Sequence, residues 1–234
     1  MKKVIQFALL VGVFYSILPT FLLRRSSESV IRTTNAQGIL LTFDDGPNAI
    51  YTPQLLDILA QHDVKATFFV VAKKAQQHPA IIERIVREGH TIGIHHYTHK
   101  HSYFLTPYFL YRELKQSQQI LQHLTKQPIA LYRPTYGHMT MATWPIAQKL
   151  GLRIVLWSDD FKDWRTKHSQ SSEQLQAMLN ANKDGAIYLL HDDGQNFGAN
   201  DGAPYFMLYQ LQQFLKTIDT STLAKPTAIF NTFK

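Results

Sequence analysis

The chain has 234 residues, of which 45% are hydrophobic and none is cysteine, and its 24 Lys and Arg against 17 Asp and Glu give a formal net charge of +7. Disulfides and thiolate metal sites are therefore excluded, and any bound metal needs His and carboxylate ligands. The charge fits either a basic soluble surface or attraction to an anionic polymer. No run of Lys and Arg exceeds two residues and no nucleic-acid-binding signature is present, so we expect no nucleic-acid partner.

The N-terminus carries an apolar stretch. Two lysines precede a mostly apolar segment at residues 4–23, and Arg24 and Arg25 close it. As a helix, this segment is long enough to span a bilayer. A cleaved signal peptide would need a shorter apolar core and an Ala-x-Ala-like site, so we favour an uncleaved signal anchor over a signal peptide for residues 1–25, and both over a buried core helix. Either preferred reading predicts an extracytoplasmic protein, membrane-anchored by this segment or secreted.

Strand-like and helix-like stretches alternate along the rest of the chain. After a polar, aperiodic linker at residues 26–37, runs rich in apolar and β-branched residues predict strands at residues 38–43, 66–71, 91–94, 129–132, 153–157, 186–190 and 227–230. Helical spacing predicts helices at residues 51–62, 79–89, 107–124, 142–150, 172–180 and 205–218. This alternation predicts one α/β domain, residues 38–234, in which helices cover a parallel sheet. Six or seven such units favour a barrel over an open sheet.

Polar residues follow five of the predicted strands: Asp44-Asp45, His95, Arg133, Asp160 and His191. In a parallel barrel the C-terminal ends of the strands meet at one face, so we expect these side chains to converge there. Adjacent carboxylates repel each other and need a cation, a proton or a hydrogen-bonded partner. The alternative is that the two aspartates only form the turn before Gly46-Pro47.

His95 and His99 could supply that cation. Histidines at positions i and i+4 face the same side of a helix or tight turn and can share a metal ion, although the same spacing also occurs by chance on protein surfaces. Together with one aspartate they would make three protein ligands, which leave an open coordination position as in catalytic zinc sites. The other aspartate would then remain available as a general base.

Five segments, in order, resemble the motifs of the polysaccharide deacetylases, the family that contains the nodulation-type chitooligosaccharide deacetylases (carbohydrate esterase family 4). They are Thr42–Pro47, His95–His99 (similar to H-[ST]-x-x-H), Arg133–Gly137 (similar to R-x-P-[YF]-G), Asp160–Trp164 (D-x-x-D-W) and Leu189–Asp192. Residues 66–71 also resemble the family's A-T-F-F-V strand. One motif alone is modest evidence, but five in order make coincidence negligible.

The resemblance implies a distorted (β/α) barrel with six or seven parallel strands and a divalent metal bound by Asp45, His95 and His99. The metal in this family is most often zinc, and other divalent transition metals are compatible with the same ligands. The implied activity is hydrolysis of N-acetyl groups on a glycan that contains N-acetylglucosamine, such as peptidoglycan or a chitin-like polymer, with release of acetate. We expect the enzyme to be a monomer.

The resemblance also implies a catalytic base and a catalytic acid. Asp44 would be the base, oriented by Arg133 through charge pairing. His191 would be the general acid that protonates the leaving amine, oriented by Asp163. Without the family pattern, Arg133 could equally form a surface ion pair.

Three further residues would contact the substrate if the resemblance holds. The backbone N–H of Tyr136 would stabilise the tetrahedral oxyanion. Trp164 and Leu190 would wall a small apolar pocket for the acetyl methyl group, although both could instead be plain core residues.

Two positions depart from the family pattern. His96 stands where the family has Ser or Thr, and Thr135 stands where it usually has a second proline. Neither change removes a group that the mechanism requires.

The same site could also serve an O-acetyl esterase acting on an acetylated polysaccharide, and a non-catalytic glycan-binding relative could keep the fold.

Overall fold

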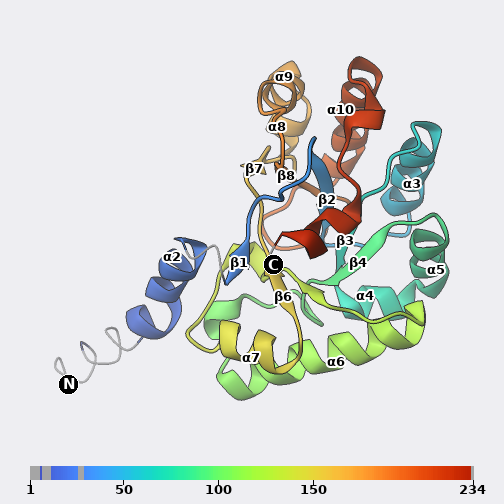
Figure 1. Ribbon diagram of the computed structural model, residues 1–234. Helices are drawn as coiled ribbons and strands as arrows, with labels where there is room; N and C mark the ends of the chain where they lie inside the picture. The colour runs from blue at the N-terminus through green and yellow to red at the C-terminus, as the bar shows by residue number, and fades with distance from the viewer. Residues whose placement is uncertain (1–5, 7–11, 26–28, 233–234) are drawn as a thin grey trace.

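The computed structural model describes residues 6, 12–25 and 29–232. Its centre is a sheet of eight parallel strands in the order β1-β6-β5-β4-β3-β2-β8-β7. The strands curl into an open barrel (Figure 1). They span Val30–Ile31 (β1), Leu40–Asp44 (β2), Thr67–Val70 (β3), Thr91–Ile94 (β4), Leu131–Tyr132 (β5), Arg153–Val155 (β6), Asp159–Asp160 (β7) and Ile187–His191 (β8).

The predicted α/β barrel is confirmed, and six of the predicted strands form as β2 to β6 and β8. Two more strands bring the number to eight instead of six or seven. β1 lies within the stretch expected to be a linker, where Val30 pairs with Ile154 of β6. β7 pairs with β8, where Asp160 is opposite Leu189. Unlike β5, which ends the apolar run 129–132, β1 and β7 are two-residue strands in polar surroundings and show no pattern by which a strand is recognised in a sequence.

The strand predicted at residues 227–230 is wrong, because this stretch forms the 3-10 helix η5, Pro226–Asn231. Pro226 occupies the first position, where its missing N–H costs no hydrogen bond. The buried residues of η5 are Pro226 and Ile229, which are one 3-10 turn apart. Ile229 belongs to the same buried cluster as Leu40 and Ile187, the first residues of β2 and β8. The helix therefore covers the N-terminal end of the barrel.

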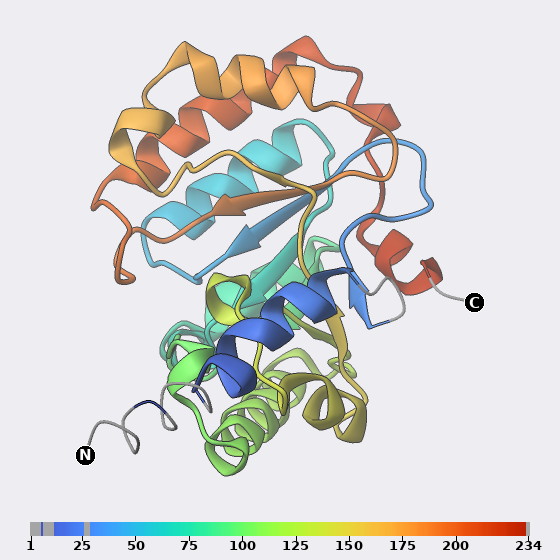
Figure 2. The ribbon, with the colours of Figure 1, turned by 90° about the vertical axis from the view of Figure 1, so that its left-hand side faces the viewer.

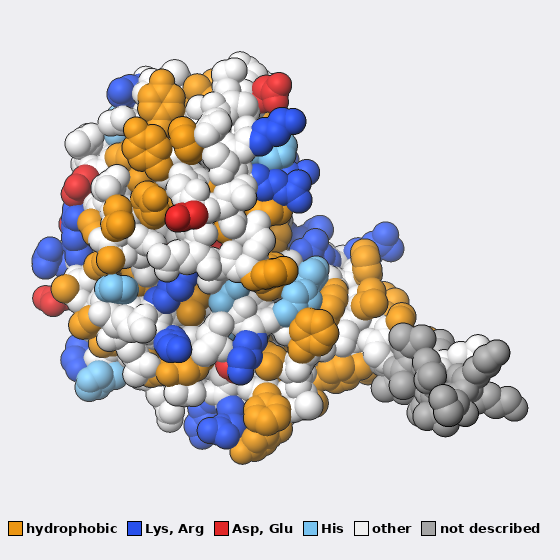
Figure 3. Space-filling model, turned by 180° about the vertical axis from the view of Figure 1, so that it is seen from behind, with side chains coloured by type: hydrophobic (Ala, Val, Ile, Leu, Met, Phe, Trp, Pro, Cys, Tyr) orange, Lys and Arg blue, Asp and Glu red, His pale blue; other side chains and the backbone are white. Residues whose placement is uncertain are grey.

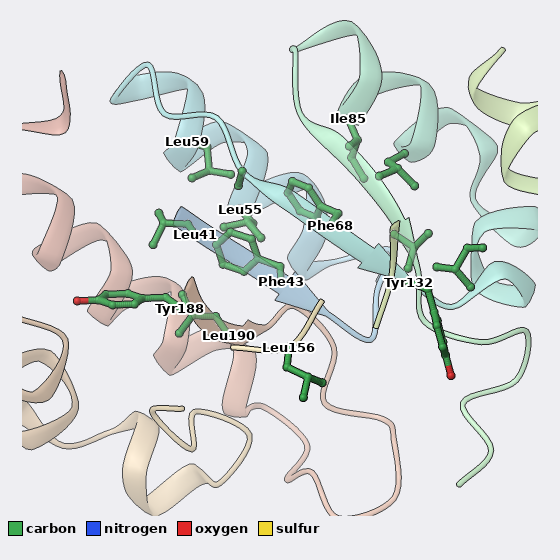
Figure 4. Close-up of a cluster of buried hydrophobic side chains, with 14 of the residues drawn as sticks. Leu41, Phe43, Leu55, Leu59, Phe68, Ile85, Tyr132, Leu156, Tyr188 and Leu190 are labelled. Atoms are coloured by element: carbon green, nitrogen blue, oxygen red, sulfur yellow. The ribbon is translucent and has the colours of Figure 1, made fainter. Parts of the chain in front are cut away.

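Helices cover the outer face of the sheet and enclose the larger part of the core. They are α3 (Tyr51–Gln61), α4 (Ala72–Gln77), α5 (Pro79–Arg87), α6 (Pro107–Thr125), α7 (Thr143–Lys149), α8 (Thr166–Ser169), α9 (Ser172–Asn180) and α10 (Ala203–Thr217). Phe43 of β2 and Phe68 of β3 stack at a centroid distance of 5.4 Å in the same cluster as Leu55 of α3 (Figure 4). Full burial of such a side chain contributes roughly 1.5–3 kcal/mol, so this layer anchors the strand that ends in Asp44.

Alternation along β2 directs its polar side chains into the barrel. Leu41 and Phe43 belong to the outer cluster beneath the helices, whereas Leu40 belongs to the inner cluster. Thr42 and Asp44 share the face of Leu40, because side chains two residues apart in a strand point the same way. The alternation of β2 therefore places the Asp44 carboxylate at the inner rim of the barrel.

The N-terminal segment is helical and lies against the barrel. Residues Val13–Ile17 form the π-helical turn η1, Leu18–Arg25 form α2, and Figure 2 shows α2 crossing the front of the domain. Within the described stretches, no helix is long and apolar enough to cross a membrane. Residues 1–5 and 7–11 of the predicted anchor lie outside the described part of the chain. Membrane insertion of this segment stays a prediction.

Candidate active site

The structure brings the polar residues that follow the strands to the C-terminal end of the barrel. Asp44 ends β2 and His191 ends β8, and the two are Cα partners in the strand register. His95 follows β4, and Arg133 follows β5. A cavity of about 270 Å³ opens there, lined by Asp44, Asp45, His95, His99, Tyr136, Trp157, Asp160, Trp164, Leu189, His191 and Asn196–Ala199.

Asp45, His95 and His99 direct one ligand atom each toward a common point, and these atoms lie within 4.8 Å of one another. Oδ1 of Asp45 is 3.3 Å from Nε2 of His95 and 3.0 Å from Nε2 of His99. This oxygen is buried without a hydrogen-bond partner among the described residues, which is costly unless a cation binds it. One carboxylate and two imidazoles suit zinc and related divalent metals. The residues present therefore fit a divalent metal.

The protonation of these ligands also favours a metal. Burial alone would raise the pKa of Asp45, but the nearby His99 and His95 hold that pKa well below its usual range. Nδ1 of His95 lies 2.8 Å from the carbonyl oxygen of Arg133. Since a carbonyl only accepts, Nδ1 donates its proton there, and Nε2 is the ring nitrogen directed toward Asp45.

The loop between the two histidines is held by Glu113 of α6. His96 and His99 adopt left-handed backbone conformations with φ of 63° and 54°, which are costly for residues other than glycine. The Glu113 carboxylate accepts hydrogen bonds from the N–H of Tyr97 at 2.9 Å and of Thr98 at 3.2 Å, and from the Thr98 hydroxyl at 3.1 Å. These bonds stabilise the strained loop from its outer side.

Both departures from the family pattern find partners in the structure. Nε2 of the buried His96 is 2.7 Å from the Tyr132 hydroxyl, and the two rings stack. Burial lowers the pKa of His96 well below its usual value, so this imidazole is neutral. The hydroxyl of Thr135 donates to the carbonyl of Lys100 at 2.7 Å, a hydrogen bond that a proline could not make. The Thr135 loop is thereby tied to the chain directly after His99.

Asp44 is paired with a fully buried arginine. Nη1 of Arg133 donates to Oδ1 of Asp44 at 2.7 Å, and Arg133 has no exposed surface. Its other contacts are Thr42 Oγ1 at 2.8 Å, the carbonyls of Val155 and Leu156 at 3.2 and 2.9 Å, and the ring of Phe69 at 4.0 Å. A guanidinium held at so many points fixes the orientation of the carboxylate beside it. The alternative of a surface ion pair is thus excluded.

His191 is paired with Asp163 in the same way. Nδ1 of His191 lies 2.8 Å from Oδ1 of Asp163, and the backbone N–H of His191 donates to Oδ2 at 2.7 Å. Burial would lower the pKa of His191, but the buried Asp163 carboxylate, with smaller effects of Asp45 and Asp44, raises this pKa to about 10. The imidazole is therefore a cation at neutral pH whose Nε2–H can be donated.

Tyr136 and Trp164 line the cavity, as the resemblance implies, but Leu190 lies elsewhere. Leu190 belongs to the outer core beneath the helices, together with Tyr188 (Figure 4). Leu189 lines the cavity instead. The reason is the alternation of β8, because Leu189 shares a face with His191, whereas Leu190 points to the opposite face.

Two features of the site were not recognised in the sequence. Asp192 is buried beneath the site, where its carboxylate accepts from the N–H of Gly46 at 3.0 Å and from the Thr52 hydroxyl. Asp192 ends the motif Leu189–Asp192, but the motif assigns it no role. The segment Asn196–Ala199 closes one side of the cavity, and Nζ of Lys74 links Asn196 to the backbone carbonyl of Asp45. No pattern in this polar, glycine-containing loop predicts where it folds.

Fold and site together define a class of α/β-barrel protein in which a carboxylate paired with an arginine, a histidine paired with an aspartate and three residues that could hold a metal line one cavity. The chain matches the family described as polysaccharide deacetylase over residues 31–155, and it belongs to that family. The relatives named for their activity are deacetylases, which are hydrolases of N-acetyl groups, and this protein is an enzyme of that kind.

Three comparisons show how far the likeness extends. The chain is 34% identical over 164 residues to a peptidoglycan-N-acetylglucosamine deacetylase of Bacillus cereus, which covers 69% of this chain and 76% of the relative. It is 35% identical over 176 residues to a chitooligosaccharide deacetylase of Bradyrhizobium, covering 75% and 78%. A crystal structure of a peptidoglycan N-acetylglucosamine deacetylase in complex with a naphthalenyl N-oxidanyl-benzamide superimposes with a TM-score of 0.76 at 29% identity, covering 88% of this chain and 94% of that one.

Proposed function

We propose that the protein is a metal-dependent hydrolase that removes N-acetyl groups from N-acetylglucosamine units of a glycan, either peptidoglycan or a chitin-like polymer, and releases acetate. The observation that carries the proposal is the arrangement around one cavity. Asp44 is paired with Arg133, His191 is paired with Asp163, and the buried oxygen of Asp45 lies between two imidazoles. The two relatives named above, one for peptidoglycan and one for chitooligosaccharides, support this substrate class.

The chain supplies both proton transfers of an amide hydrolysis. Asp44 accepts a proton from the attacking water, whose oxygen forms a bond to the acetamide carbonyl carbon. His191 donates its Nε2 proton to the amide nitrogen as the carbon–nitrogen bond breaks, so the products are acetate and a free sugar amine. A histidine with a pKa of about 10 holds its proton until the leaving nitrogen takes it. The proton on Asp44 then returns to His191 or to solvent.

The remaining residues of the cavity bind and orient. We propose zinc as the metal at Asp45, His95 and His99, where it would polarise the acetamide carbonyl and lower the pKa of the attacking water. The backbone N–H of Tyr136 donates to the carbonyl oxygen as negative charge develops there. Trp164 and Leu189 form an apolar wall for the acetyl methyl group.

We also infer that the N-terminal segment associates with a membrane and that the enzyme works outside the cytoplasm. Six apolar side chains of η1 and α2 are between 37% and 62% exposed, namely Val13, Phe14, Ile17, Leu18, Phe21 and Leu22. Their spacing places them on one face of the helix, and Figure 3 shows apolar side chains along the segment beside the grey residues. Sedimentation with lipid vesicles tests this, because replacing Phe21 and Leu22 by Ser should weaken binding. Equal binding of that variant would contradict the inference.

Acetate release tests the activity itself. The full-length protein is loaded with Zn²⁺ and incubated with N-acetylglucosamine oligomers, peptidoglycan and acetylated xylan. The proposal expects acetate and free amines from the first two and background release from the third. Release from acetylated xylan alone would support the O-acetyl esterase, and background release from all three by metal-loaded protein would support a non-catalytic relative.

Asp44→Asn separates the base from the metal site. The variant should keep bound zinc, because the ligands are unchanged, and should lose roughly 10²–10⁴-fold in kcat, the usual effect of removing a general base. Asp63→Asn is the matched control, since the Asp63 side chain is 95% exposed. Near-wild-type turnover of Asp44→Asn would show that another group accepts the proton.

A further inference from the structure

Helix α2 contacts the loop that carries Tyr136, and we propose that Thr20 and Arg24 of α2 are positioning residues for the oxyanion site. The N-terminal helix would then be part of the catalytic apparatus as well as a candidate membrane contact. This inference rests on the proposed function, in which the Tyr136 N–H stabilises the oxyanion. The segment that α2 contacts is residues 136–141, which we call the oxyanion loop.

Thr20 makes the tightest of these contacts. Its Oγ1 accepts a hydrogen bond from the N–H of Met139 at 2.8 Å and donates one to the carbonyl of Met139 at 2.9 Å. The Tyr103 hydroxyl donates to the same oxygen at 3.1 Å. Thr20 is only 4% exposed. Its hydroxyl therefore uses one donor and two acceptor positions, which is its full capacity, and both polar groups of Met139 depend on it.

Arg24 makes a second contact one helical turn further along. Its Nη2 donates to the carbonyl of Gly137 at 3.3 Å, and its guanidinium lies 5.5 Å from the ring centroid of Trp157. Gly137 has a φ of 63°, and a side chain there would collide with Trp157 and Arg24. Gly137 is thus enclosed between an arginine of α2 and a tryptophan that lines the cavity.

The oxyanion loop begins with a residue in a strained backbone conformation. Tyr136 adopts the left-handed conformation with φ 58° and ψ 10°, which costs about 1–2 kcal/mol for a residue other than glycine. Its ring is 5.0 Å from that of the metal ligand His99 and 4.9 Å from that of His101. A strained residue beside the metal ligands keeps its geometry only while its neighbours hold it. Met139 and Gly137, which follow Tyr136 closely, are the neighbours that α2 binds.

A further contact ties the same helical segment to the end of the loop. The N–H of Met141 donates to the carbonyl of Tyr15 at 2.9 Å. Figure 2 shows α2 lying beside the turn of residues 135–137 at the rim of the barrel. The polar side of the segment therefore faces the oxyanion loop, whereas its apolar side chains are exposed.

A set of Thr20 variants in the full-length, zinc-loaded protein tests the inference. Thr20→Val keeps the side-chain shape and removes the hydroxyl, Thr20→Ser keeps the hydroxyl, and Thr222→Val removes an exposed hydroxyl that donates to the nearby carbonyl of Asp219. Complete loss of an oxyanion donor costs about 10²–10³-fold in kcat, so a displaced donor should cost roughly tenfold. We expect Thr20→Val to lose about tenfold in kcat with an unchanged KM and zinc content, and to exchange the Met139 amide hydrogen faster. Thr20→Ser and Thr222→Val should behave as wild type.

The outcomes are distinguishable. Wild-type kcat in Thr20→Val, or an equal loss in Thr222→Val, would overturn the positioning of the oxyanion loop by α2. If Thr20→Val folds poorly, Arg24→Gln provides the same comparison at Gly137, and its wild-type kcat would be equally decisive. If the wild type itself releases no acetate, the proposed function fails. Unchanged exchange at Met139 in Thr20→Val would then separately overturn the contact.

Discussion

Replacing Asp163 by Asn should move the alkaline limit of activity, because this carboxylate is what keeps His191 protonated. The pKa of His191 is raised from 6.5 to about 10, and Asp163 is the largest cause acting in that direction. One pKa unit corresponds to about 1.4 kcal/mol, so the difference amounts to roughly 5 kcal/mol in favour of the imidazolium. Asparagine keeps the shape and removes the charge, while burial of His191 continues to lower its pKa.

The sign of the effect follows from the titration. His191 must be charged to donate its proton, so kcat should fall as pH rises through its pKa. In Asp163→Asn we expect the falling limb of the kcat–pH profile to move down by about two pH units or more. The maximal kcat should also drop by about 100-fold or more, because the imidazole loses its oriented tautomer. The stability that the pair provides is present below pH 6.5 and is lost as the pH rises toward 10, so the unfolding free energies of variant and wild type should converge at high pH.

Acetate release measured across pH 5–11 checks the catalytic part, and an NMR titration of His191 in the zinc-loaded protein checks the pKa directly. Asp201→Asn, at an exposed position, is the control for the loss of one negative charge. An active Asp163→Asn enzyme with an unshifted alkaline limb would refute the reasoning, because His191 would then owe its charge to other groups.

Two other predictions concern the groups around the base and the metal. Arg133→Met should leave Asp44 as an unpaired buried charge and lower the free energy of unfolding by about 3–5 kcal/mol, measured by urea unfolding. The control Arg84→Met breaks a partly exposed ion pair and should lower it by about 1 kcal/mol or less. Similar losses in both variants would show that burial of the Asp44–Arg133 pair does not determine the effect. Glu113→Ala should weaken zinc binding by about 10–100-fold in chelator competition, because the loop between the histidines loses its three hydrogen bonds. The control Glu83→Ala, at an exposed position, should bind zinc with wild-type affinity. Unchanged affinity in Glu113→Ala would show that the loop between His95 and His99 keeps its conformation without Glu113.

The sequence predicts this fold well where strands are long and buried. β2 and β8 each have five residues, and their apolar content and polar ends were sufficient to locate them. The two-residue strands β1 and β7 form because neighbouring strands offer hydrogen-bonding edges, which is a tertiary effect without a local signal. The strand prediction for residues 227–230 is wrong because the local sequence is ambiguous. Pro226 and a single buried isoleucine suit a 3-10 turn as well as a strand.

The candidate site shows the same division. Residues at strand ends could be assigned in advance, because the strand fixes where its last side chain points. The resemblance implies Leu190 at the cavity, but the alternation of β8 directs Leu189 there and Leu190 into the outer core. Asn196–Ala199 and helix α2 approach the site from distant parts of the chain, and their docking depends on contacts such as that of Thr20 with Met139. Such contacts join single polar atoms and leave no periodic pattern in a sequence.

The buried guanidinium of Arg133 has a consequence for the molecule as a whole. It follows β5, binds residues of β2 and at the end of β6, and lies over a ring of β3. One side chain thus joins four strands of an open barrel and also orients the catalytic base. If β6 separates from β5, the guanidinium loses the carbonyls of Val155 and Leu156 as acceptors. Its hydrogen bond to Asp44 then no longer holds that carboxylate in one orientation. Activity should therefore fall before the sheet as a whole unfolds. Substitutions that stabilise the contacts of β6 with Arg133 should also hold Asp44 more firmly in its catalytic orientation.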